Sequence, residues 1–124
     1  MRRFSVDCTN VRSFADFIEA INVGFIRPVG GEWNGNLDAL HDYFSWQNEE
    51  AYELQLLGQQ NCSTALGHEA QADWLRAHLS TCHPDNVPVL RKRLDAADRR
   101  EGDTLFDVLC GIMADNSHVT FLFA

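Results

Sequence analysis

The amino-acid sequence predicts an α/β fold in one domain that spans residues 1–124. Three short segments have the composition of β-strands, and segments with a helical spacing of apolar residues separate them. A chain of 124 residues is long enough to bury one hydrophobic core. Two predicted helices lie between the first two strands, and crossovers of this kind typically join parallel strands.

The first strand and the first helix follow from the order of apolar residues. Residues 3–8 alternate between apolar and polar side chains, which predicts a short strand. Ser13 then opens a capping-box-like start, and apolar residues at helical spacing predict a helix over residues 14–23. Gly24 is a natural C-terminal stop for that helix.

A glycine-rich loop is predicted over residues 24–36, and Trp33 lies near its end. An indole on such a loop either packs onto the core or is offered to a partner, because tryptophan is enriched in interface hot spots. The pattern leaves both interpretations open.

The helix predicted over residues 37–45 is the most informative segment of the chain. Asn36 suits its N-cap, because the side-chain oxygen can accept from a free amide of the first turn. Asp38 and Asp42 lie one turn apart on one face, and His41 lies beside the apolar stripe. That stripe consists of Leu37, Leu40 and Phe44.

The stacked carboxylates of Asp38 and Asp42 have two interpretations. Like charges at this spacing oppose each other by about 0.2–0.5 kcal/mol, so the pair carries a small cost. It is either a solvated acidic face or an anionic surface that docks on a basic partner.

The middle of the chain predicts a second strand followed by helices. Residues 51–57 alternate and end apolar, which predicts a strand, and residues 58–67 read as a polar loop. A helix is predicted over residues 69–81, and Pro88 suits the first turn of another. The basic residues of this next helix predict a solvated face: Arg91, Lys92 and Arg93.

The last helix and strand complete the predicted elements. Gly102 or Asp103 opens a helix whose apolar residues continue to Met113. The nearly continuous apolar run over residues 118–123 predicts a strand buried on both faces, and hence a central position in the sheet.

Charge is unevenly distributed, and it restricts the classes of partner. The formal net charge is −8, and no Lys or Arg occurs from Pro28 to Leu75. An acidic region of this size repels nucleic-acid phosphate and attracts a basic protein. No secretory signal and no apolar run of transmembrane length is visible, so the expected compartment is the cytoplasm.

Cysteine and histidine spacing gives weak support for a metal. The four cysteines contain no CxxC pair, and we expect reduced thiols that mostly lie in the core: Cys8, Cys62, Cys82 and Cys110. Five potential ligands lie close together in the sequence: Cys62, His68, His78, Cys82 and His83. Their spacing matches no usual zinc pattern, so neither a metal nor another cofactor is predicted.

Catalysis also has weak support. The chain contains no GxSxG motif, Walker loop or Rossmann glycine pattern. His41 with Asp38 and Asp42 forms the acid–base alternative, but these side chains project in two directions. We therefore do not expect an enzyme.

The run Asn36-Leu37-Asp38-Ala39-Leu40, followed by Asp42, resembles the signature helix of the barstar family. Members of this family are intracellular inhibitors of secreted bacterial ribonucleases. The similarity extends to residues 11–13 and to the final helix and strand at residues 105–123. It implies a three-stranded parallel sheet packed by about four to five helices, with an extra helical insertion at about residues 58–101.

The resemblance also implies a function. In this family the second helix and the loop before it plug the ribonuclease active site, with acids where RNA phosphates would lie. It implies a cytoplasmic, immunity-type inhibitor that is monomeric when free and binds a basic secreted ribonuclease or nuclease toxin, without direct nucleic-acid or membrane contact. The implied partner-binding residues are Trp33, Asn34, Gly35, Asn36, Leu37, Asp38, His41, Asp42 and Trp46.

The chain departs from the family pattern at three places. Asn34-Gly35 stands where founding members have glycine followed by an acid, and His41 replaces an aromatic residue. A further family acid would fall near Arg99, where only Asp98 and Glu101 are close.

Two other functions remain open from the sequence. The chain can be a barstar-fold interaction module whose partner is not a ribonuclease and which binds through the added region around Trp74. Less support exists for a small enzyme or metal protein built on His41 or on the Cys62–His83 segment.

Overall fold

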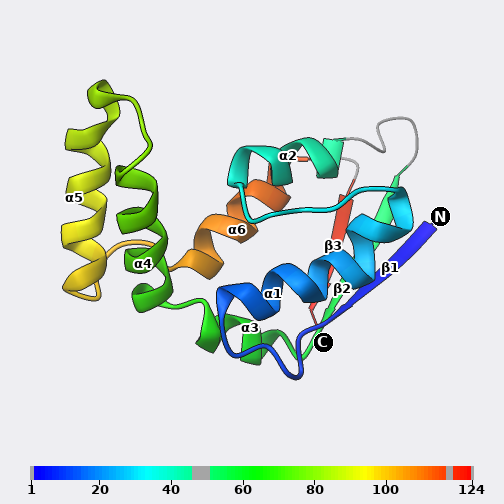
Figure 1. Ribbon diagram of the computed structural model, residues 1–124. Coiled ribbons are helices and arrows are strands. Elements are labelled where there is room, and N and C mark those ends of the chain that lie inside the picture. Colours follow the sequence, from blue (N-terminus) through cyan, green and yellow to red (C-terminus); the bar gives the residue numbers. More distant parts are fainter. Residues whose placement is uncertain (1, 46–50, 117–118, 124) are drawn as a thin grey trace.

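The computed structural model describes residues 2–45, 51–116 and 119–123. Its three strands and six α-helices alternate along the chain in an α/β arrangement, as the sequence predicts (Figure 1). The elements are β1 (Arg2–Asp7), α1 (Phe14–Ile21), η1 (Asn22–Ile26), η2 (Arg27–Val29), α2 (Leu37–Ser45), β2 (Tyr52–Leu57), α3 (Gln59–Ala65), α4 (His68–Leu79), η3 (Pro84–Asn86), α5 (Val87–Asp98), α6 (Leu105–Ala114) and β3 (Val119–Phe123).

The strands form one parallel sheet in the order β1-β2-β3. Arg2 pairs with Tyr52 in the first ladder, and Tyr52 pairs with Val119 in the second. The prediction of a parallel sheet is therefore confirmed. The central strand is β2, however, so the prediction that the last strand lies centrally is wrong.

The position of β3 at the sheet edge explains its exposed apolar side chains. Leu122 is 41% exposed and Phe123 is 51% exposed, so this strand is not buried on both faces. Its apolar composition marks only the side that packs on the helices, where the Phe121 ring meets Phe44 of α2 at 5.9 Å. A five-residue apolar run cannot distinguish a central strand from an edge strand on composition alone.

One face of the sheet carries the main hydrophobic core. In β1 the buried residues Phe4 and Val6 alternate with exposed ones, and in β2 Tyr52, Leu54 and Leu56 are buried. Helices α1, α2 and α6 supply the opposite side of this core with further aromatic and aliphatic residues. The side chains of α2 that face inwards are thus held against the sheet.

The first helix continues beyond its predicted end. Gly24 does not stop it, because the chain proceeds through the π-helix η1 and the short 3-10 helix η2 as far as Val29. A side chain at Gly24 would place its Cβ on the backbone of Ser5 in β1. This glycine therefore serves the close packing of a helix on a strand, and the predicted loop is shorter than the range 24–36.

Residues 58–67 contain helix α3, which the sequence did not predict. Of its seven residues, Gln59–Ala65, only Cys62 is buried, so the segment has no apolar stripe from which a helix can be inferred. The sixth α-helix of the structure therefore exceeds the expected number of four to five.

Cys62 of α3 forms a disulfide with Cys8, which contradicts the expectation that all four cysteines are reduced. The pairing follows from the topology, because Cys8 comes directly after β1, Cys62 comes shortly after β2, and these strands are parallel neighbours. Cys82 and Cys110 are free thiols. Burial, with a contribution from Asp107, raises the pKa of the Cys110 thiol to about 11.

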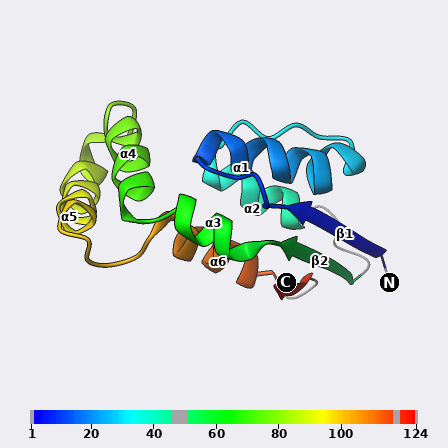
Figure 2. The same cartoon turned by 90° about the horizontal axis from the view of Figure 1, so that it is seen from below.

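Helices α4 and α5 form a hairpin that stands beside the sheet rather than on it (Figures 1 and 2). Five buried residues form their own small cluster: Ala72, Leu75, Leu90, Leu94 and Ala97. The last helix begins one or two residues later than predicted, because Thr104, and not Gly102 or Asp103, is its N-cap and forms a capping box with Asp107. Within the described ranges, no helix is long and apolar enough to cross a membrane.

Candidate functional site

The candidate site is the exposed face of α2 together with the loop that precedes it. Asn36 caps the helix as predicted, because its Oδ1 accepts a hydrogen bond from the Ala39 amide at 3.0 Å. Leu40 and Phe44 are buried, each with about 1% exposure, and they fix the helix to the core. The capped end and the buried face together determine where the opposite face points.

Asp38, His41 and Asp42 are exposed on α2. Among the residues that the structure describes, neither carboxylate has an ion-pair or hydrogen-bond partner. The predicted pair of outward carboxylates one turn apart is thus present, and both can accept new hydrogen bonds. His41 makes no side-chain hydrogen bond to either of them, so the acid–base cluster considered from the sequence is not assembled.

Trp33 is buried, with 2% exposure, and this decides between its two interpretations. Its ring packs edge-on against Phe14 and Phe17, at centroid distances of 5.8 and 6.4 Å. Its Nε1–H donates to the carbonyl of Asn36 at 2.7 Å. The Trp33 side chain therefore packs onto the core and holds the loop onto the helix start, and its direct contact with a partner stays a prediction.

Asn22 fixes the same loop from the other side, and the sequence analysis missed it. Its Nδ2 donates to the Trp33 carbonyl at 2.9 Å, and its Oδ1 accepts from the Trp33 amide at 2.8 Å. The asparagine is 1% exposed, and each polar atom of its side chain has a hydrogen-bond partner on the loop backbone. A signal was available, because Asn22 lies four residues after Ile18 and three before Phe25, on the apolar face of the helix.

Two further contacts close the loop. The Tyr43 hydroxyl of α2 donates to the Glu32 carbonyl at 2.9 Å. Arg27 binds both Glu19 and Glu32 at 2.8 Å, and its guanidinium holds the pKa of each carboxyl below the usual value. Glu32 is thereby engaged within the molecule, unlike the two aspartates of α2.

The remaining predicted contact residues lie at the start of α2. Asn34 is exposed, and its Oδ1 accepts from the Asn36 amide at 3.1 Å. Gly35 has φ +99°, a left-handed conformation that favours glycine, and it packs near Ile18. Leu37 is half-buried at the edge of the core. Trp46, predicted as a contact residue, and His118 lie outside the described residues.

The five potential metal ligands of residues 62–83 are not brought together. Cys62 is in the disulfide, His68 faces the Gly102 carbonyl at 3.1 Å, and His78 stacks on Trp74. His83 accepts from the Asp85 amide, and Cys82 lies near the Leu79 carbonyl. Over residues 2–45, 51–116 and 119–123, no three His, Cys, Asp or Glu side chains are placed to hold a metal ion.

The acids near Arg99 are also engaged elsewhere. Asp98 pairs with Arg76 of α4, and Glu101 pairs with Arg99 at 3.3 Å. Both carboxylates are thus engaged within the molecule, away from α2. The basic residues of α5 are exposed, in agreement with the predicted solvated face: Arg91, Lys92 and Arg93.

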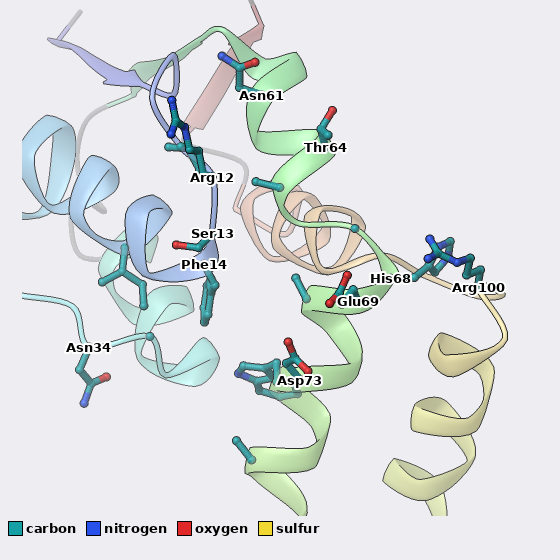
Figure 3. A pocket seen from close by; sticks show the side chains of 18 residues that line it. Arg12, Ser13, Phe14, Asn34, Asn61, Thr64, His68, Glu69, Asp73 and Arg100 are labelled. Atoms are coloured by element: carbon teal, nitrogen blue, oxygen red, sulfur yellow. The ribbon is translucent and has the colours of Figure 1, made fainter.

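A cleft of about 1010 Å³ lies beside the candidate site, between the start of α1, the loop before α2 and the hairpin helix α4 (Figure 3). Asn34 and Gly35 form part of one wall, next to Phe14. Trp74 and Asp73 of α4 form part of the other. The loop that leads into α2 thus borders both the acidic helix face and this cleft.

No protein-family model, curated protein or solved structure matches this chain.

Proposed function

We propose that this protein is a cytoplasmic, immunity-type inhibitor that binds a basic ribonuclease or nuclease toxin and masks its active site with α2. The observation that carries the proposal is the pair of exposed, unpartnered carboxylates of Asp38 and Asp42 on a helix whose other face is buried. The two carboxylates repel each other, and no cation of the described residues pairs with them. Arg or Lys side chains of a partner would relieve that repulsion.

The chemistry of the target supports this interpretation. A ribonuclease active site holds phosphate with Arg and Lys side chains, and these groups also pair well with carboxylates, arginine often through two parallel hydrogen bonds. Asp38 and Asp42 would occupy the positions of phosphates and keep RNA out. No bond is made or broken in this mechanism, so it requires neither a metal nor a cofactor.

The loop contributes pre-organisation rather than contact area. Asn22 and the Trp33 indole fix the backbone before α2 with three buried or partly buried hydrogen bonds. A surface that is already ordered loses less conformational entropy on binding. Asn34, Gly35, Asn36 and His41 would lie at the edge of the contact, around the two aspartates.

A cytoplasmic location is compatible with the disulfide. Cys8 and Cys62 have no exposed surface, and thiol–disulfide exchange requires direct access of an attacking thiolate to a sulfur atom. The bond is therefore shielded from small thiols in the folded protein.

A capture experiment with a charge-neutral variant tests the proposal. The wild type, Asp38→Asn/Asp42→Asn and the control Asp95→Asn/Asp115→Asn are immobilised and exposed to extract and secreted protein from the source cells. The control removes two exposed acids that lie outside α2. We expect the wild type and the control to retain a basic nuclease and the α2 variant to lose it.

Equal retention of the nuclease by all three proteins would contradict the proposal. Retention of a partner without nuclease activity, by all three proteins, would instead favour the alternative of an interaction module that binds through the region around Trp74. The structure gives this alternative one specific support, which is the cleft beside α4.

A further inference from the structure

The cleft between the loop before α2 and helix α4 has two acids and an aromatic ring on the α4 wall and a second aromatic ring on the α1 wall (Figure 3). Glu69 and Asp73 lie one helical turn apart on α4, and both are exposed. Phe14, at the start of α1, lies on the opposite wall, and Trp74 lies next to Asp73. The hairpin therefore repeats, across the cleft, the spacing of the two carboxylates of α2.

Positive charges also line the cleft, but they lie at its margins. Figure 3 shows Arg12 at the α3 end, near Asn61, and Arg100 beyond His68. The acids of the cleft lie on α4, where Figure 3 shows Glu69 and Asp73 on the wall across from Phe14. A ligand group that enters between α4 and Phe14 meets these carboxylates.

The carboxylate of Asp73 remains available to such a group. It contacts Arg76 at 3.2 Å, but the two side chains are 71% and 52% exposed, and exposed pairs of this kind contribute little. Arg76 also pairs with Asp98 of α5, which directs its guanidinium towards the other helix of the hairpin. Among the described residues, Glu69 has no ion-pair partner at all.

Aromatic rings beside carboxylates favour one type of side chain. A guanidinium or ammonium group can pair with the carboxylate while its flat face or its aliphatic stem lies on a ring. The Trp74 ring is held in place by stacking on His78, with centroids 4.8 Å apart and planes at 12°. Its orientation is therefore fixed before any ligand arrives.

We propose that this cleft receives an Arg or Lys side chain on a protruding loop of the same basic partner that α2 binds. The proposal rests on the proposed function, because it takes from it the basic character of that partner. Continuity of the surface supports it, since Asn34 and Gly35 line the cleft and the next residue, Asn36, caps α2. The hairpin would thus add a second, separate contact to the interface.

A titration with small peptides tests the cleft without the partner. Acetyl-Gly-Arg-Gly amide and acetyl-Gly-Glu-Gly amide are added to the isotope-labelled protein, and the Trp74 indole N–H and the Asp73 amide are followed by NMR. We expect the arginine peptide to shift both signals and the glutamate peptide to shift neither. In Glu69→Gln/Asp73→Asn, which preserves side-chain size, the shifts should disappear.

Three results would overturn the proposal. In the first, the arginine peptide leaves the Trp74 and Asp73 signals of the wild type unchanged. In the second, it shifts them equally in the wild type and in the variant. In the third, the glutamate peptide shifts the signals of residues near Arg12. The last result would assign the cleft to an acidic segment. If the variant does not fold, the comparison of the two peptides on the wild type still decides.

A second measurement separates this inference from the proposed function. Affinity for the nuclease retained by the wild type is compared for Glu69→Gln/Asp73→Asn and for the control Asp95→Asn/Asp115→Asn. We expect a loss of about three- to tenfold in the cleft variant only, as for two exposed charge pairs. No loss in the cleft variant, with a large loss in the α2 variant, would overturn the inference and leave the proposed function intact.

Discussion

The molecule has two regions: the sheet body, which is the sheet with α1, α2, α3 and α6, and the α4–α5 hairpin. These regions are stabilised very differently. Among the described residues, nineteen buried apolar residues form the core of the body, and Phe17, Phe25, Trp33, Phe44 and Tyr52 are its large aromatic members. The apolar cluster of the hairpin has five buried members, all of them Leu or Ala, so its own core is too small to hold two helices independently. The body therefore carries most of the core, and we expect the hairpin to have low local stability.

The junction between the two regions lies after α3. Cys62 and Leu66 belong to the core of the body, and the disulfide connects Cys62 to the end of β1. Residues 58–101 therefore divide between the two regions, because α3 belongs to the body and the chain leaves it only at α4.

Truncation of one buried side chain in each region compares their contributions to stability. Phe44→Ala removes a ring that stacks on Phe25 at 5.4 Å, and we expect it to lower the free energy of unfolding of the whole molecule by about 3–5 kcal/mol. Leu75→Ala in the hairpin should cost about 2 kcal/mol or less in global unfolding. Denaturant unfolding with native-state hydrogen exchange measures both effects.

The exchange pattern distinguishes the regions. In Leu75→Ala, amides of α4 and α5 should exchange faster while those of β2 keep their protection. Equally faster amide exchange in all elements would show that the hairpin and the body unfold as one cooperative unit.

The disulfide gives the next largest effect. Cys8→Ser/Cys62→Ser opens a covalent loop with a sequence separation of 54, and we expect a loss of about 2–4 kcal/mol. The control Cys82→Ser/Cys110→Ser leaves that loop closed. Equal losses of stability in the two variants, measured by thermal and denaturant unfolding under oxidising conditions, would show that the bond does not stabilise the junction.

Two buried side-chain amides, of Gln71 and Asn22, should affect stability in opposite directions when each is replaced by an apolar side chain. Gln71 of α4 is 2% exposed, and its Oε1 has no hydrogen-bond partner among the described residues. Gln71→Met should therefore leave stability unchanged or raise it by up to about 1 kcal/mol. Asn22→Leu, in the body, should lower stability by about 2–4 kcal/mol, because it leaves the Trp33 amide and carbonyl without partners.

Chemical denaturation of the two amide variants checks this contrast. If Gln71→Met lowered the free energy of unfolding, the Gln71 side chain would be hydrogen-bonded in solution, for example to water. The buried polar groups of the hairpin would then be as well paired as those of the body.

The smallest effect concerns pH and the ion pairs of the body. Arg27 lowers the pKa of Glu19 in the folded state, so the pair stabilises the fold above the ordinary glutamate pKa and loses its effect as the pH falls through the folded value. Glu19→Gln should therefore lower the melting temperature slightly at about pH 7 and not in acid, where both proteins lack the charge. A difference that persists in acid would exclude an electrostatic origin.

The sequence predicts those parts of the fold whose signal is local. Helix α2 with its Asn36 cap has an apolar stripe within one segment, and the structure confirms both. The edge position of β3, the helix α3 and the Cys8–Cys62 bond depend on contacts between segments far apart in the chain, which periodicity cannot show.

The candidate site also has one feature that local spacing predicts and one that depends on contacts between distant segments. The exposure of Asp38 and Asp42 follows from helical spacing and is correctly predicted. The burial of Trp33 depends on Phe14, Phe17 and Asn22, which surround it only in the folded chain. Helical spacing thus predicts which side chains are exposed, whereas the burial of a loop aromatic residue depends on contacts that the spacing does not show.

Inhibition of RNA cleavage shows whether the carboxylates of α2 mask the active site of a basic nuclease, as we propose. RNA cleavage by the nuclease captured on the wild type is assayed with increasing wild type, Asp38→Asn/Asp42→Asn or Asp95→Asn/Asp115→Asn. We predict full inhibition by the wild type and the control, and a loss of potency of about tenfold or more for the α2 variant. Undiminished inhibition by the α2 variant, folded as shown by an unchanged melting curve, would contradict the claim.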